Sequence, residues 1–575
     1  MSSSPHDKPT ASPSSSVRHL LALSRQTTQA THVRSMSYNE RRRAALREVD
    51  EAKFSRFHLK ACLVAGVGFF TDAYDVFAIT IGATMIGIVY GHDGALTPNQ
   101  DLGIKVATPI GTLIGQLLFG WLADVVGRKR MYGVELIIII IGTIGQTISG
   151  QGPSFSIIAP LIIWRFIMGV GIGGDYPLSA VITSEFAATR IRGRMMTAVF
   201  AMQGFGNFAA ALVALTVTET YKSRIVDGPV TFDAVDDCWR LLVGLGAVPA
   251  VITLYFRLTM PETPRFTMDV ERNVRQASQN VSTFLTTGSH IIDPDAAVER
   301  VEAPKASRRD FARHFGQWKN GKVLLGTAYS WFALDVAFYG LGLNTSIVLT
   351  TIGFRDSTST DRQMKAYQTL HNVSIGNIIL SACGLIPGYW VTFLFIDRWG
   401  RKPIQFMGFA VLTVIFVCMG FGYDRMVHTT PAAKKAFVFL YCLANFFQNF
   451  GPNTTTFIVP GEAFPTRYRS TAHGISAASG KFGAVVAQLG FAFLRNNTNS
   501  GVFVQRILEI FAIFMLTGFF ATFLIEETNG RTLEELSNES QDNFIANDSR
   551  QFENNDSGAS SSSGQATLNI HESGE

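Results

Sequence analysis

The sequence predicts an all-α membrane protein in which twelve transmembrane helices form two six-helix bundles related by pseudo-two-fold symmetry. Three observations support this fold class: long uncharged runs, positive charges sorted by loop, and an internal repeat. Of the 575 residues, 47% are hydrophobic and 16% are charged, whereas soluble domains carry about 25% charged residues. Segments 195–218, 371–396 and 436–461 are uncharged and reach the ~20 residues that a membrane span needs. A large soluble helical protein would not bury so many runs of this kind.

The apolar runs fall into two sets of six, separated by a polar linker. The first set lies near 60–88, 104–123, 132–150, 156–183, 195–218 and 240–258. The second set lies near 322–350, 371–396, 404–423, 436–461, 471–494 and 505–525. We therefore expect an amino-terminal bundle at 58–260, a cytosolic linker with short helices at 261–321, and a carboxy-terminal bundle at 322–526.

Both ends of the chain are predicted to be disordered. Residues 1–57 are rich in Ser, Thr and Arg and contain no apolar run long enough for a signal peptide. A mitochondrial transit peptide is the alternative, because the first part of this segment is poor in acids. Residues 527–575 are rich in Ser and acidic residues, which is typical of a disordered tail.

Lysines and arginines gather in loops that share one side of a twelve-span protein. They precede the first span and follow the second, fourth, eighth and tenth spans, as in Arg128-Lys129-Arg130. Positive residues in short loops mark the cytosolic side. Both termini and the central linker are therefore expected in the cytosol.

The two halves of the chain repeat two motifs at nearly the same spacing. GWLADVVGRKR at 120–130 matches TFLFIDRWGRKP at 392–403, and EFAATRIR at 185–192 matches EAFPTRYR at 462–469. Their charged residues lie at cytosolic helix ends, where ion pairs between them would latch the halves together when that side is closed. The gate residues predicted in this way are Asp124, Arg128, Glu185, Asp397, Arg401 and Glu462.

Charged residues inside the predicted spans are functional candidates, because a charge at mid-bilayer costs about 2.5–3.5 kcal/mol. They are Asp72, Asp75, Arg165, Asp175, Asp335 and Lys481. Trp331, Asp335 and Tyr339 are spaced i, i+4, i+8 and line one face of the seventh span. This face is either a hydrogen-bonding surface for a solute or a packing ladder between helices. The ammonium of Lys481 suits an anion, or it neutralises a carboxylate.

The first bundle holds the acids that suit proton carriage. Asp72 and Asp75 are three residues apart, and two carboxylates so close would share one proton when desolvated. Asp175 follows a glycine-rich stretch that allows close helix contact. Arg165 lies about 15 Å from it along the helix, so we expect Arg165 to pair with Asp72 or Asp75. A plain ion pair with Arg165 is the alternative role of Asp75.

These motifs resemble known families. GWLADVVGRKR and its copy resemble the loop signature of the major facilitator superfamily, and PETPRF at 261–266 with EETNGRTLEEL at 526–536 is similar to its sugar-porter-related branch. GGDYPLS at 173–179 more specifically resembles the signature of the fungal and plant proton-coupled inorganic phosphate symporters. The resemblance covers about residues 58–540 and implies the major facilitator fold in a multi-pass protein of the plasma membrane.

The resemblance implies a phosphate site and a proton path. The residues at the matching phosphate-site positions are Tyr176, Gln203, Trp331, Asp335, Tyr339, Asn453 and Lys481. The proton path implied by the family uses Asp72 and Asp175. The chemistry agrees, because a phosphate monoanion offers acceptors to these donors and O–H groups to a carboxylate. We therefore expect a secondary transporter that imports inorganic phosphate by proton symport.

Two other functions are kept as alternatives. A symporter of glycerophosphodiesters or other organic anions would share the phosphate chemistry, and a phosphate-sensing transceptor would suit the long tails. The chain has no Walker motif, its glycine-rich stretch lies within an apolar span, and its five cysteines have no metal-site spacing. We expect no enzymatic activity, cofactor, metal or nucleic-acid partner. The expected partners are phosphate, protons and the lipid bilayer, and the oligomeric state is left open.

Overall fold

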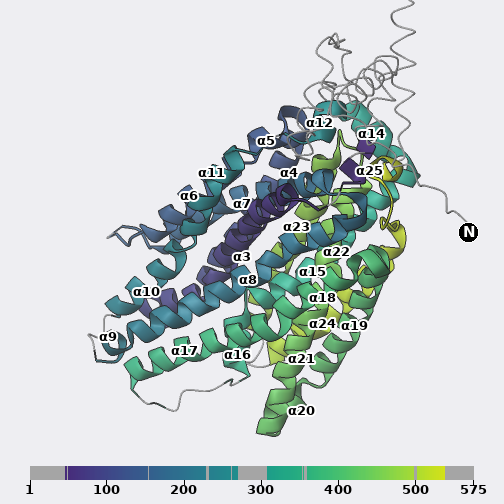
Figure 1. The fold of residues 1–575 in the computed structure, drawn as a ribbon. Helices are drawn as coiled ribbons and strands as arrows, with labels where there is room; N and C mark the ends of the chain where they lie inside the picture. Colours follow the sequence, from purple (N-terminus) through teal and green to yellow (C-terminus); the bar gives the residue numbers. More distant parts are fainter. Residues whose placement is uncertain are drawn as a thin grey trace, which may run out of the picture.

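The computed structural model describes residues 46–537 except 48, 53, 93, 153, 228–231, 261, 270–306, 353, 355–358, 360 and 498–501. The expectations for 1–45, for 270–306 of the linker and for 538–575 lie outside the described residues. Within them the chain is helical, and its β contacts are two isolated bridges. Two groups of long helices lie side by side, the amino-terminal one in purple and blue and the carboxy-terminal one in green and yellow (Figure 1).

Six spans form the first bundle. They are α3 (Arg56–Tyr90), α4 (Pro98–Val126), α6 (Val134–Thr147), α7 (Ile158–Phe186), α8 (Arg192–Thr220), and α10 (Asp233–Gly244) continued by α11 (Ala247–Leu258). The connections between them carry α5 (Arg128–Met131), η1 (Thr189–Ile191) and α9 (Lys222–Val226).

The second bundle has six spans in the same order, and four of them consist of more than one helical segment. They are α15 (Trp318–Gly342) with α16 (Thr345–Thr351); α17 (Arg362–Leu380), η2 (Ser381–Leu385) and α18 (Ile386–Trp399); α19 (Arg401–Phe421); α21 (Pro431–Asn449) with α22 (Pro452–Ala463); α23 (Arg469–Asn497); and α24 (Val502–Ala521) with η3 (Thr522–Leu524). Helix α20 (Tyr423–His428) joins α19 to α21, while α12 (Pro264–Asp269), α14 (Arg308–Gly316) and α25 (Leu533–Leu536) lie outside the bundles.

The predicted twelve-helix fold is confirmed, although two spans fall short of a simple hydropathy test. Among the described residues, nine helices are long and apolar enough to cross a membrane, and α15 with α16 forms a tenth as a pair bent by 57°. Helix α6 is only 14 residues long. The tenth span breaks at Gly451, after which Pro452 begins α22, because proline cannot donate the backbone hydrogen bond that would continue α21.

The outer surface of the bundles is apolar. Large hydrophobic side chains such as Ile148, Phe421, Phe439 and Phe493 are each at least 65% exposed. The interior has the opposite character, since many charged and hydrogen-bonding side chains are buried between the helices. This inside-out distribution is what a bilayer requires, because lipid solvates apolar side chains and cannot satisfy polar ones.

Glycines bring α4 and α7 into close contact, as the glycine-rich stretch predicts. A Cβ atom added at Gly115 would lie 2.1 Å from the carbonyl oxygen of Val170, and one at Gly169 would lie 2.4 Å from that of Thr108. Only the absence of a side chain allows the two backbones to approach so closely. This packing holds α7, and with it the signature Asp175, deep in the first bundle.

Some described residues of the two predicted tails are buried. Leu46 and Val49 are buried, although they lie in the segment expected to be disordered, and helix α3 begins at Arg56. Leu533 and Leu536 are likewise buried within the predicted carboxy-terminal tail. A few apolar anchors therefore hold these polar segments on the bundles. Both segments lie at the end of the molecule that carries α12, α14 and α25, called the terminal end below (Figure 1).

Candidate functional site

The seven residues predicted for the phosphate site meet between the two bundles, in the interior of their membrane spans. Helices α7 and α8 supply two of them, α15 supplies three, and α22 and α23 supply one each. All seven side chains are buried, with between 1% and 5% of each residue exposed. The structure thus brings together every residue of this predicted set, from both halves of the chain.

The centre of this cluster is an ion pair. The Lys481 ammonium lies 2.8 Å from a carboxylate oxygen of Asp335. The same ammonium lies 4.4 Å from the ring centre of Tyr339 and 4.9 Å from that of Tyr176, so two aromatic faces also stabilise its charge. Gly480 makes room for the pair, since a Cβ there would lie 2.9 Å from Asp335 Oδ2.

Neutral hydrogen-bonding groups surround the ion pair. Tyr176 and Tyr339 approach each other across the bundle interface, with 3.5 Å between their hydroxyl oxygens. Gln203 donates to the Tyr176 hydroxyl at 3.2 Å. On the other side, Asn453 donates to the Tyr389 hydroxyl at 2.9 Å. The cluster therefore offers an anion several hydrogen-bond donors beside the Lys481 ammonium, whose charge is balanced by Asp335.

Tyr389 and Asn449 belong to this cluster and were missed by the sequence reasoning. Asn453 donates to the Asn449 side-chain oxygen at 2.7 Å. Asn445, Asn449 and Asn453 recur every four residues and form an amide ladder along the tenth span. That periodicity was a usable signal, but a search restricted to charged intramembrane residues passes over it.

An aromatic layer closes the cluster toward the terminal end. Phe200 of α8 stacks on Phe457 of α22, with 4.3 Å between ring centres, and Phe69 of α3 contacts Phe457 at 5.2 Å. His473 packs edge-on against Trp331 at 5.5 Å. These side chains are fully buried. A solute in the cluster cannot pass toward the terminal end until the layer separates.

A second charged network lies within the first bundle. Arg257 contacts Asp175 at 2.6 Å and Glu135 at 2.8 Å, and all three side chains are fully buried. Gly68 makes room for it, since a Cβ there would overlap the guanidinium group. Sequence reasoning missed Glu135 and Arg257 because they lie at the ends of predicted spans, where a charge is ordinarily solvated.

Asp72 differs from the other acids of this network. It is 2% exposed, and neither carboxyl oxygen has a hydrogen-bond partner among the described residues. It lies within electrostatic range of Asp175, Arg257 and Asp75. A buried ionised carboxylate without a hydrogen bond is costly, so this arrangement favours the neutral acid at Asp72.

The predicted ion pair of Arg165 is not formed in the described part of the chain. Arg165 donates to the Gln146 side chain at 3.2 Å and to the Ile104 carbonyl at 2.8 Å. Asp75 instead accepts a hydrogen bond from Thr143 at 3.0 Å, and no bond joins it to Asp72. The error arose because neutral acceptors on neighbouring helices were not considered as partners for the arginine.

The six predicted gate residues form two matching clusters at the terminal end. In one cluster Arg128 contacts Asp124 at 3.1 Å and Glu185 at 3.5 Å. In the other cluster Arg401 contacts Asp397 at 3.1 Å and Glu462 at 2.9 Å. A threonine hydroxyl donates to each glutamate, from Thr263 to Glu185 and from Thr528 to Glu462. The repeat in the sequence is therefore a repeat in structure.

Each cluster also joins one bundle to the other. Arg469 at the start of α23 contacts Glu185 of the first bundle at 2.8 Å. The backbone N–H of Thr471 donates to Asp124 at 2.7 Å, and that of Arg194 donates to Asp397 at 3.0 Å. Each aspartate thus caps the first turn of a helix in the opposite bundle, where a negative charge is favoured. These contacts close the terminal end.

The opposite end is closed as well, by fewer polar contacts. Lys105 of the first bundle donates to the Asn344 side chain of the second at 3.1 Å, and Asp101 contacts Arg495 at 3.5 Å. Glu219 of α8 accepts a hydrogen bond from Tyr367 of α17 at 2.8 Å. The central cluster is consequently enclosed from both ends, and the described state is occluded.

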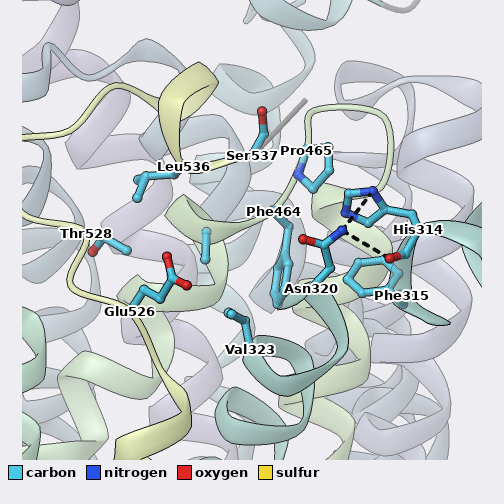
Figure 2. Close-up of a pocket in the computed structure, with 11 residues that line it drawn as sticks. His314, Phe315, Asn320, Val323, Phe464, Pro465, Glu526, Thr528, Leu536 and Ser537 are labelled. Carbon is cyan, nitrogen blue, oxygen red and sulfur yellow. Dashed lines mark hydrogen bonds between the residues drawn. The ribbon is translucent and has the colours of Figure 1, made fainter. Parts of the chain in front are cut away.

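A separate pocket lies at the terminal end between α14, the start of α15 and the carboxy-terminal segment. Figure 2 shows Asn320 donating to the His314 backbone carbonyl, at 3.1 Å, with Glu526, Leu536 and Ser537 around the pocket. Nearby, Arg265 of α12 contacts both Asp50, at 2.8 Å, and Glu534, at 3.0 Å. The described segments around Asp50, Arg265 and Glu534 are therefore held together next to the gate clusters.

The sequence profile of the sugar (and other) transporter family matches residues 61–539. The chain is 50% identical over 522 residues to the repressible high-affinity phosphate permease of Neurospora crassa, a match that covers 87% of this chain and 90% of that protein. It is 47% identical over 524 residues to the inorganic phosphate transporter PHO84 of Saccharomyces cerevisiae, covering 87% of each. The chain belongs to the major facilitator superfamily, in the same family as these fungal phosphate transporters. The resemblance noted in the motifs is thereby confirmed.

The family extends to plants, and solved structures share the fold. The probable inorganic phosphate transporter 1-4 of Oryza sativa subsp. japonica is 40% identical over 524 residues, covering 86% of this chain and 95% of that protein. The structure of the proton:xylose symporter XylE bound to 6-bromo-6-deoxy-D-glucose matches with a TM-score of 0.64 at 20% identity, over 84% of this chain and 98% of that one. At this identity the likeness concerns the fold alone.

Proposed function

We propose that this chain is a secondary active transporter that imports inorganic phosphate by proton symport. The observation that carries the proposal is the Lys481–Asp335 ion pair, which tyrosine, tryptophan and amide side chains enclose where the two bundles meet. Sites between the repeats of such transporters are the ones that alternating access exposes to each side in turn. The high identity to phosphate transporters supports phosphate as the solute.

The chemistry of the central cluster suits dihydrogen phosphate. Lys481 supplies a cation for the anion's oxygens, and Asp335 can accept a hydrogen bond from a P–OH group. Tyr339 beside the ion pair, and Tyr176 and Gln203 of the first bundle, supply neutral donors. In the occluded protein Lys481 and Asp335 balance each other's charge, so neither is buried unpaired. When phosphate binds, the anion would balance part of the charge of Lys481 in place of Asp335.

The proton is proposed to travel on Asp72. In the described state Asp72 has no hydrogen-bond partner, while Arg257 is already shared by Asp175 and Glu135. A neutral Asp72 fits this charge balance. On losing its proton it would compete with Asp175 for Arg257, so that its protonation is tied to the packing of α3, α7 and α11.

Transport would proceed by alternate opening of the two ends, with the terminal end facing the cytosol and the protein in the plasma membrane. Opening toward the cytosol requires the cross-bundle contacts of Glu185, Asp124 and Asp397 to break, together with the aromatic layer. The relatives are transporters, and we propose transport without an enzymatic reaction and without a cofactor.

Uptake of labelled phosphate into proteoliposomes tests this proposal. With the outside acidic, phosphate should accumulate above its external concentration, and a protonophore should abolish the accumulation. Lys481→Ala should remove uptake, while an excess of a glycerophosphodiester should not compete. Equilibration without accumulation would refute proton symport, and effective competition by the diester would favour the alternative substrate class.

A further inference from the structure

A polar pocket lies between the bundles on the side of the central cluster away from the terminal end. Its polar walls come from Asn207 on α8, Asn377 and Ser381 on the eighth span, Thr345 at the start of α16, and Asn445 on α21. None of these residues belongs to the central cluster. Asn207 lies one helical turn beyond Gln203, and Asn445 lies one turn beyond Asn449. The pocket therefore lies about one helical turn from the central cluster, on the side away from the terminal end.

We propose that this pocket is an outer subsite for dihydrogen phosphate, occupied before the anion reaches the central cluster. The inference rests on the proposed function. Its polar groups are uncharged, so the site would bind weakly and release its ligand readily. That property suits a passage site, since conduction needs binding that is favourable enough to admit a solute and weak enough to let it leave.

The free hydrogen-bonding groups of the pocket complement the anion. The side-chain amides of Asn377 and Asn445 donate to carbonyls of their own helices, at 2.9 Å to Val373 and 3.0 Å to Tyr441. Their side-chain oxygens are thus left to accept hydrogen bonds. Dihydrogen phosphate has two P–OH groups that can donate to such acceptors.

Asn207 supplies the donor and also joins the two bundles at the wall of the pocket. Its side-chain oxygen accepts a hydrogen bond from Ser381 of the opposite bundle at 3.3 Å, while its amide nitrogen has no hydrogen-bond partner among the described residues. A phosphate oxygen can accept from that nitrogen. Separation of the bundles at this end breaks the Asn207–Ser381 bond and frees the Asn207 oxygen as a further acceptor.

The backbone at this point is unusual in a way that supports a functional role. Residues Ser381–Leu385 form a π-helical turn between α17 and α18, and Ser381 and Leu385 both line the pocket. Single π-turns inside α-helices are rare and are frequently located at functional sites. Here the turn carries the hydroxyl that reaches Asn207 across the interface.

Substitutions at the two ends of the Asn207–Ser381 hydrogen bond distinguish a phosphate subsite from a simple gate. Asn207→Ala removes the proposed ligand group, and Ser381→Ala removes only its competitor. Each breaks the cross-bundle bond. If the pocket binds phosphate, Asn207→Ala should raise KM roughly two- to tenfold, as expected for the loss of one hydrogen bond, with a nearly unchanged maximal rate. Ser381→Ala should lower KM.

The measurement is the concentration dependence of initial phosphate uptake into proteoliposomes. Thr216→Ala is the matched control, because Thr216 lies on the same helix, is exposed, and bonds only to its own helix. If both substitutions lower KM, or if Asn207→Ala has the same KM as the wild type, the pocket is not a phosphate subsite. Asn445→Ala, on the opposite wall, should raise KM in the same way and replaces Asn207→Ala if that variant misfolds. Failure of the wild type to take up phosphate would overturn the proposed function itself.

Discussion

Replacing Asp72 by asparagine should uncouple phosphate transport from protons without destabilising the protein. The amide has the shape of the neutral acid and cannot lose a proton. No hydrogen bond is lost, because neither oxygen of Asp72 has a partner among the described residues. The free energy of unfolding should therefore change by less than about 1 kcal/mol, which is the range of substitutions that break no specific interaction.

The size of the coupling defect follows from the driving force. One proton moving down a gradient of two pH units supplies about 2.7 kcal/mol, since each unit is worth about 1.4 kcal/mol. One-to-one symport can then accumulate phosphate about 100-fold. For Asp72→Asn the accumulation ratio should fall to about one, while phosphate binding and exchange of labelled for unlabelled phosphate across the membrane persist.

Asp175→Asn is the informative comparison, because Asp175 has the partner that Asp72 lacks. It contacts Arg257 at 2.6 Å and accepts a hydrogen bond from Ser179. Breaking a buried ion pair costs about 3–5 kcal/mol, although Glu135 would keep part of the charge of Arg257 compensated. Asp175→Asn should thus lower thermal stability where Asp72→Asn does not. Accumulation by Asp72→Asn at the wild-type ratio would refute the assignment of the proton to Asp72.

Three further predictions concern the central ion pair, the gate and the chain ends. Lys481→Ala should weaken phosphate binding about tenfold or more, because a hydrogen bond to a charged group is worth roughly 1.5–3 kcal/mol. Calorimetry measures the phosphate affinity, and unchanged affinity in both Lys481→Ala and Asn453→Ala would exclude this site. Arg469→Ala removes the cross-bundle contact with Glu185, so the closed gate should open more often and a cysteine placed at His473 should be labelled faster. Arg506→Ala is the control, because it removes only an exposed ion pair within one helix, and it should leave the labelling rate unchanged. Burial alone would raise the pKa of Glu534, but the nearby charge of Arg265 has the larger effect and lowers that pKa to about 2. The ionised Glu534 therefore holds α25 on the bundles fully above about pH 4.5, and this docking should weaken as the pH falls toward 2. Limited proteolysis measures that docking, and Glu534→Gln should be cleaved at neutral pH where the wild type is protected.

The fold could be predicted from the sequence because a bilayer restricts what a chain can do. Uncharged runs of sufficient length must become helices, and the repeated motifs at 120–130 and 392–403 fix which helices correspond. The positions of the gate residues also follow, since Asp124 and Asp397 recur at the same distance before a helix turn, but the sequence did not predict that this gate is closed. The apolar run at 132–150 indicated the span in which α6 lies, although this helix is only 14 residues long. Hydropathy did not indicate the break at Gly451.

All seven residues predicted for the central cluster meet in the structure, but two neutral members, Tyr389 and Asn449, were missed. Asp335 and Lys481 stand out because a buried charge is costly, whereas Tyr389 and Asn449 differ little from ordinary helix residues until their partners are known. Arg257 and Glu135 were missed for a different reason. At the end of a span a charge is usually solvated, and only the packing of α3 and α7 around Arg257 shows that it is buried.

In the proposed symport mechanism, the two charged networks would divide the work between the bundles. In the second bundle the charges of Lys481 and Asp335 balance each other, so the central cluster can close without a solute. In the first bundle Asp72, Asp175 and Glu135 share the single arginine Arg257, and closure favours a proton on one of the acids. Loss of that proton would add a negative charge to the bundle that packs against the proposed phosphate site. Because Tyr176 follows Asp175 on α7 and contacts Tyr339 across the interface, a rearrangement around Asp175 would reach the phosphate ligands directly.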